Sequence, residues 1–92
     1  MYSGRITEIG TVIETSPSLV IHAQKTAAEL SPGGSVDVNG TCLSAVSVDA
    51  ATGSFTAQIC AETAARSTLA ELRADDRVNL ELPLRQIGRA HV

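Results

Sequence analysis

Residues 35–44 read SVDVNGTCLS, and this stretch decides the fold. Val36 and Val38 alternate with polar residues, which predicts a strand with both valines facing inward. Asn39-Gly40 is a dipeptide that tight hairpin turns favour, because both residues tolerate positive φ. A second strand is predicted over residues 42–48. The stretch therefore predicts a β-hairpin.

Working outward from this hairpin, the chain consists of short segments rich in β-branched residues and separated by turn signals. Further strands are predicted over residues 6–13, 19–23 and 54–60, and the alternation of Val78, Leu80 and Leu82 predicts a sixth. Short helices are predicted over 26–30 and 62–72. Gly10 indicates a bulge or a close approach within the first strand. These segments predict an all-β fold, a closed or nearly closed six-stranded antiparallel barrel with two short helices.

One spacing pattern occurs twice. Residues 30–38 match residues 72–80: in each, a leucine ends a helix, a polar turn reverses the chain and an alternating strand begins. The repeat is too short to be a duplicated domain. It predicts one helix–turn–strand connection used twice.

Composition limits the classes of function. The 92 residues suffice for one domain, and with 2% aromatic residues the core must be aliphatic. The net charge is −3 with scattered basic residues, which argues against a nucleic-acid partner. We see no membrane span, metal-ligand spacing, phosphate cradle or secretion signal, and we expect no metal or cofactor. We therefore expect a cytoplasmic protein with reduced Cys42 and Cys60.

Four blocks of the sequence resemble the riboflavin synthase family. MYSG at residues 1–4 is similar to the family's M-F-T-G, and residues 35–44 are similar to S-V-x-V-N-G-x-C-L-T. ETAARSTL at 62–69 is similar to E-T-L-R-x-T-x-L, and DRVNLE at 76–81 is similar to G-D-x-V-N-L-E. The blocks occur in the family's order and spacing, and they extend to about residue 85.

The resemblance implies a fold, a six-stranded antiparallel Greek-key barrel with two short helices, and also an activity. Subunits of the family carry two similar barrels in tandem and assemble as trimers, and each barrel binds one 6,7-dimethyl-8-ribityllumazine. Two such molecules, held face to face between the N-terminal barrel of one subunit and the C-terminal barrel of its neighbour, dismutate into riboflavin and a ribitylamino-pyrimidinedione. No metal or redox cofactor takes part. The main contribution of the protein is then proximity and orientation.

Three functions remain open for the chain itself. The first is the N-terminal lumazine-binding barrel of a riboflavin synthase, weakly active or inactive alone. The second is a non-catalytic lumazine- or flavin-binding protein of the same family. The third is a structural barrel with a decayed site, against which the retention of the motif residues argues.

The resemblance assigns ligand contacts in two early segments. Gly4, Arg5 and Ile6 match the N-terminal contact segment, although Arg5 replaces an aliphatic residue of the family. That guanidinium either meets the edge of the ligand or disturbs the usual packing. Without the resemblance, these residues are an ordinary strand start.

Cys42, Leu43 and Ser44 match the family's C-L-T ligand segment, and alternation places Cys42 and Ser44 on one face. The family's cysteine is proposed to add to the acceptor ring or to assist a water molecule in doing so. Ser35 matches a serine that assists proton transfer, so Cys42 and Ser35 are the candidate catalytic residues. Taken alone, Cys42 is more often a small buried hydrophobic residue, and Ser35 a turn residue.

A third segment matches the stretch whose backbone pairs with the pteridine edge. It comprises Gln58, Ile59, Cys60, Ala61, Glu62 and Thr63. Thr63 also fits a helix N-cap, and Cys60 fits core packing.

The family pattern breaks after about residue 85. We expect the barrel over residues 1–86 and a separate tail over 87–92. This tail is either a remnant of the family's G-G-H-x-x-x-G-H-V segment or non-native sequence, since a common sequencing-adaptor string translates to the same residues. We expect the isolated barrel to form a two-fold dimer, because the surface that a tandem barrel covers would otherwise be open.

Overall fold

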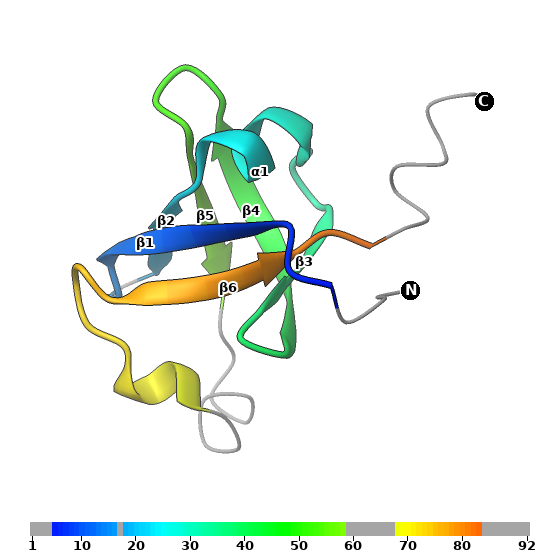
Figure 1. Ribbon diagram of the computed structural model, residues 1–92. Coiled ribbons are helices and arrows are strands. Elements are labelled where there is room, and N and C mark those ends of the chain that lie inside the picture. The colour runs from blue at the N-terminus through cyan, green and yellow to red at the C-terminus, as the bar shows by residue number, and fades with distance from the viewer. Residues whose placement is uncertain (1–4, 17, 59–67, 84–92) are drawn as a thin grey trace.

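The computed structural model describes residues 5–16, 18–58 and 68–83, and it shows a closed barrel (Figure 1). Its elements in chain order are β1 (Glu8–Glu14), β2 (Leu19–His22), α1 (Gln24–Glu29), β3 (Ser35–Val38), β4 (Thr41–Asp49), β5 (Ser54–Gln58), η1 (Thr68–Glu71) and β6 (Arg77–Glu81).

The strands follow one another around the barrel in the order β1-β2-β5-β4-β3-β6, and β6 closes it by pairing with β1. All neighbouring strands are antiparallel. β2 is followed in the chain by β3 but pairs with β5, so the connection from β2 to β3 passes over other strands, as in a Greek key. The predicted six-stranded antiparallel barrel is confirmed.

Alternation along each strand fills the interior with aliphatic side chains. Among the described residues Phe55 is the largest fully buried side chain, and Val36 and Val38 face inward at 0% exposure, as predicted. The remaining core is built mostly from leucine, valine, isoleucine and alanine of all six strands. Because side chains alternate along a strand, the residues on either side of an inward-facing core residue point to the outside of the barrel.

The hairpin between β3 and β4 turns as its sequence predicts. Asn39 and Gly40 both have positive φ, 50° and 89°, which is the conformation of a two-residue turn that matches strand twist. Asn39 also joins the turn to β6, because its backbone N–H donates to the Asn79 carbonyl and its Oδ1 accepts from the Asn79 N–H.

The two helix–turn–strand connections have the same geometry. Each turn closes with one backbone hydrogen bond, Gly34 N–H to Ser31 O at 2.8 Å and Asp76 N–H to Arg73 O at 3.1 Å. Each has a positive φ at the equivalent position, 87° at Gly33 and 77° at Asp75. The predicted repeated device is therefore present.

The equivalence extends to the strands against which these turns pack. The Gly33 N–H donates to Ala45 O in β4, and the Asp75 N–H donates to Val12 O in β1. Irregular register follows both acceptors, between Val12 and Glu14 and between Ala45 and Ser47. β1–β3 and β4–β6 are thus two similar halves of the barrel.

Some predicted boundaries differ from the structure. The first strand begins at Glu8, and the predicted helix over 62–72 is a 3-10 helix in its described part, ending at Glu71. Its residues 62–67 lie outside the described residues. Leu69 is buried and Leu72 packs against the core, as their spacing predicted.

Gly10 marks a close approach rather than a bulge. A Cβ atom at this position would lie 2.8 Å from Ile21 Cγ2 and from Leu80 Cδ1. The irregular register of β1 comes later, between Val12 and Glu14. Only glycine leaves room here for the side chains of β2 and β6.

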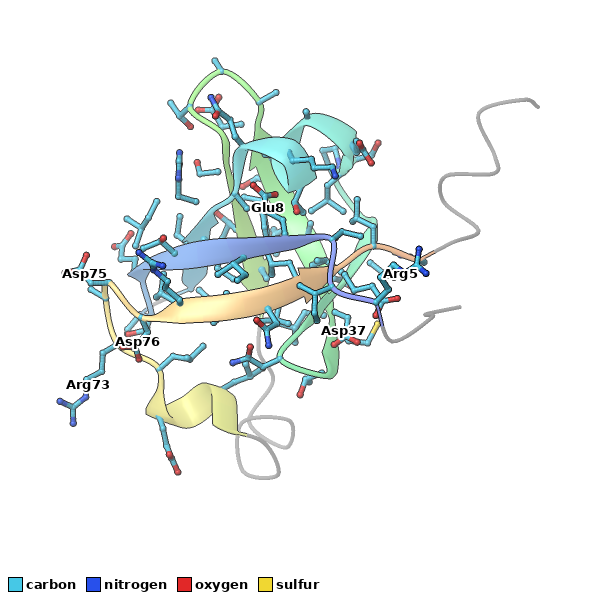
Figure 2. The ribbon with its side chains drawn as sticks, viewed as in Figure 1. Arg5, Glu8, Asp37, Arg73, Asp75 and Asp76 are labelled. Carbon is cyan, nitrogen blue, oxygen red and sulfur yellow. The ribbon has the colours of Figure 1, made fainter. Side chains whose placement is uncertain are left out.

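Glu8 fastens α1 to the barrel. Its Oε1 accepts from the backbone N–H and the hydroxyl of Thr26, each at 2.7 Å, and its Oε2 accepts from the Lys25 N–H at 3.2 Å (Figure 2). The N-cap residue Ala23 makes no side-chain cap hydrogen bond, so Glu8 satisfies helix N–H groups from a neighbouring strand.

We expect Glu8→Ala to lower the free energy of unfolding by about 1–2 kcal/mol, because it leaves donors at the first turn of α1 and the buried Thr26 hydroxyl unsatisfied. Urea unfolding followed by circular dichroism measures the loss. Glu14→Ala, which removes an exposed carboxylate from the same strand, is the matched control. Equal midpoints for the two variants would contradict this role.

Candidate ligand-binding face

Three polar side chains lie side by side across the outside of the barrel. Ser44 of β4 is directly opposite Ser35 of β3 on one side and Gln58 of β5 on the other. Directly opposed residues of antiparallel strands share a face, with Cβ atoms about 4.5–5.5 Å apart. Ser35, Ser44 and Gln58 therefore form one continuous row.

A second row runs beside the first. Asp37 of β3 is opposite Cys42 of β4, two residues along each strand from the Ser35–Ser44 pair. Cys42, Ser44 and Gln58 are exposed, and Ser35 and Asp37 are half-buried. We call Ser35, Asp37, Cys42, Ser44 and Gln58 the β3–β5 polar face.

The structure places the C-L-T segment as alternation predicts. Cys42 and Ser44 point outward together, whereas Leu43 is 5% exposed and belongs to the core. The alternative of Cys42 as a buried hydrophobic residue is therefore wrong. The Leu43 side chain faces away from the polar face, so only its backbone can contact a ligand there.

The segment that contains Arg5 and Ile6 runs along β6. The Thr7 N–H and hydroxyl both donate to the Leu80 carbonyl, at 2.8 and 3.0 Å. β6 pairs with β3 on its other side, through Asp37 and Glu81. Arg5 and Ile6 are both exposed, and Arg5 lies at the same end of the barrel as Asp37 (Figure 2).

Part of the predicted site lies outside the described residues. This holds for Gly4 and for Ile59, Cys60, Ala61, Glu62 and Thr63. The last five follow Gln58 directly in the chain.

Two carboxyl groups that the sequence did not single out lie at this face. Asp37 and Glu81 are directly opposed in β3 and β6, and Glu81 is only 4% exposed. Desolvation raises the pKa of the Asp37 carboxyl, the Glu81 carboxylate raises it further, and a hydrogen bond from the Gly40 N–H lowers it. In the sequence, Asp37 looks like an ordinary solvent-exposed residue of an alternating strand. Only the pairing of β3 with β6 shows that it lies opposite a second carboxyl group.

The similar half of the barrel carries different chemistry on the equivalent face. There Thr11 of β1 is opposite Arg77 and His22, as Ser44 is opposite Ser35 and Gln58. Ile9, opposite Asn79, occupies the position that corresponds to Cys42, and it is 59% exposed. The positions that carry Ser35, Cys42 and Ser44 on the β3–β5 polar face therefore carry Arg77, Ile9 and Thr11 in the other half.

In the part of the chain that the structure describes, no helix has the length and apolar character needed to cross a membrane. Nor do the described residues contain a group of three or more His, Cys, Asp or Glu side chains placed to hold a metal ion.

The fold and the polar face define a small antiparallel barrel with its candidate binding surface on the outside. The family model of the lumazine binding domain matches residues 3–83. The chain belongs to this family.

Curated relatives support the same family. The chain is 41% identical over 86 residues to a riboflavin synthase of Mycobacterium bovis, which covers 88% of this chain and 42% of that protein. It is 32% identical over 94 residues to a riboflavin synthase of Actinobacillus pleuropneumoniae, and this alignment covers 97% of the chain and 43% of that protein. A riboflavin synthase of Meyerozyma guilliermondii is 33% identical over 93 residues, and this alignment covers 88% of the chain and 39% of that protein. The chain thus spans less than half the length of these relatives.

Proposed function

We propose that this chain is the N-terminal lumazine-binding barrel of a riboflavin synthase and binds one 6,7-dimethyl-8-ribityllumazine or riboflavin on the β3–β5 polar face. The observation that carries the proposal is the register that aligns Ser35, Ser44 and Gln58 across three strands. The motif residues that are far apart in sequence thereby form one surface.

The chemistry of this face suits a flat, polar heterocycle. Hydroxyl groups of Ser35 and Ser44 and the amide of Gln58 both donate and accept hydrogen bonds, as the alternating edge of a pteridine requires. The exposed Cys42 thiol lies beside them and is proposed to act on the acceptor ring, with Ser35 assisting proton transfer. The proposed contacts also include Gly4, Arg5, Ile6 and residues 58–63.

An outer face contacts only one side of a flat ring. The dismutation needs two ligand molecules held face to face, so a second barrel must supply the opposing surface. We therefore propose that the chain contributes one half of the reaction site and is weakly active or inactive by itself. The full two-barrel enzyme is proposed to be a trimer acting in the cytoplasm, where an exposed thiol stays reduced.

Titration of riboflavin and of the lumazine with the full chain, followed by ligand fluorescence, tests the proposal. We expect saturable binding with one ligand per chain. Unchanged fluorescence at near-millimolar protein would overturn it.

The second candidate function is a non-catalytic lumazine- or flavin-binding protein. It is supported by the hydrogen-bonding groups of Ser35, Ser44 and Gln58, which can hold a polar ring whether or not the Cys42 thiol reacts with it. Measuring riboflavin formation from the lumazine beside the titration separates the two functions. Binding with no product, even after addition of a two-barrel enzyme lacking its own N-terminal site, would favour the second.

Self-association of the isolated chain is also proposed, as a two-fold dimer. Ile6, Ile9 and Ile13 are 48%, 59% and 47% exposed along the N-terminal segment and β1. Covering such an apolar surface stabilises a pair by about 25 cal/mol per Å², less the cost of association. A second copy of the chain provides the same surface.

We expect Ile9→Glu to convert the dimer to a monomer, because a charge on each copy would lie in the contact. Light scattering over a concentration series measures the mass. Val46→Glu on β4, which changes a side chain that is 53% exposed, is the control. A wild-type chain that stays monomeric at high micromolar concentration would refute the dimer.

A further inference from the structure

Asp37 occupies the centre of a three-strand arrangement. Its strand, β3, lies between β4 and β6, and Asp37 is opposite Cys42 on one side and Glu81 on the other. Opposed residues share a face, so the carboxyl group borders the candidate catalytic thiol.

One oxygen of this carboxyl group is unsatisfied. Oδ1 of Asp37 is shielded from solvent and has no hydrogen-bond partner among the described residues. Leaving such an acceptor unpaired destabilises the folded chain, and more strongly when the group is charged. An unsatisfied polar atom of this kind calls for an explanation, and a donor from a ligand bound on the adjoining face would supply one.

We propose that Asp37 is a further ligand-binding residue, and that its Oδ1 accepts a hydrogen bond from a hydroxyl or a ring N–H of the ligand bound beside Cys42. This inference rests on the proposed function, because it places Asp37 in the same site. Asp37 thereby contributes to specificity: a ligand without a donor at this point leaves the acceptor unpaired.

The surrounding charges agree with this role. Desolvation and the Glu81 carboxylate both raise the pKa of Asp37, which means that both disfavour its ionised form. A hydrogen bond from the Gly40 N–H counteracts them. A donor from the ligand would act in the same direction.

The test compares riboflavin affinity in the full chain, at a temperature where each variant is shown to be folded. We expect Asp37→Ala to weaken binding about tenfold, because the acceptor is lost. Asp37→Asn keeps Oδ1 and should stay within about threefold of the wild type. Glu14→Ala, which removes an exposed carboxylate from β1, should leave the affinity unchanged.

A second control separates ligand contact from support of the hairpin turn. Gly40→Ala strains the turn, where φ is 89°, without removing the Asp37 carboxyl group. We expect it to lower the melting temperature and to change the affinity less than twofold. If Gly40→Ala weakens binding as much as Asp37→Ala, Asp37 acts through the turn and the proposal is overturned.

Lumiflavin, a flavin without the ribityl chain, distinguishes the two kinds of donor. A loss in Asp37→Ala that is confined to riboflavin identifies a ribityl hydroxyl, and an equal loss for both ligands identifies a ring N–H. Affinities unchanged for both overturn the inference while the proposed function stands. If the wild-type chain binds neither riboflavin nor lumiflavin, both the inference about Asp37 and the proposed function are overturned.

One measurement needs no variant. The side-chain carboxyl ¹³C resonance of Asp37 should move when the chain is saturated with riboflavin, and that of Glu14 should not. An unmoved Asp37 resonance in a saturated sample overturns the proposal.

Discussion

Ser44→Phe is expected to abolish ligand binding while the barrel stays folded. Ser44 is exposed at the centre of the row, opposite both Ser35 and Gln58. A phenyl group there covers the surface against which the ring would lie. Because Ser44 points away from the core, the substitution adds no volume to the interior.

The expected loss of riboflavin affinity is at least about 100-fold, the result of excluding the ligand rather than of losing one hydrogen bond. Fluorescence titration measures it, with circular dichroism to verify the fold. Thr11→Phe is a matched control, because Thr11 holds the equivalent position in the other half of the barrel. If both variants bind like the wild type, the β3–β5 polar face is not the site.

Phe55→Ala is expected to have the largest effect on stability. Phe55 is 1% exposed and is the largest fully buried side chain among the described residues, whose other core members are aliphatic. Its truncation leaves a cavity and should cost about 3–5 kcal/mol. A domain of this size has a free energy of unfolding of about 5–15 kcal/mol, so the variant would be largely unfolded or close to it.

Urea denaturation at 25 °C measures this change where the variant still folds, and one-dimensional proton NMR reports its unfolding where it does not. Val46→Ala, at a position 53% exposed on β4, should change stability by less than about 0.5 kcal/mol. A Phe55→Ala midpoint equal to that of Val46→Ala would show that the barrel does not depend on this side chain.

Several features of the fold were predictable because they depend on neighbours in the chain. Asn39-Gly40 defines its turn through the φ values that the two residues tolerate, and the alternation of Val36 and Val38 defines an inward face. The spacing that links residues 30–38 to 72–80 predicted two equivalent turns. Local spacing determines the face of each strand, since side chains alternate with a period of two.

Other features were missed because they depend on which strands pair. Gly10 was ambiguous between a bulge and a close approach, and only the positions of Ile21 and Leu80 resolve it. Glu8 could not be recognised as the cap of α1, since the contact joins residues separated by 17 and 18 positions.

The candidate site divides in the same way. The sequence by itself determined the family, through its motif blocks, and the shared face of Cys42 and Ser44, through alternation, whereas only the structure shows that this face points outward. The tertiary structure alone decided that Gln58 joins Ser44 and that Asp37 and Glu81 meet beside the thiol. The reason is that the register between strands follows from the closure of the whole barrel, and no segment of the sequence contains that information alone.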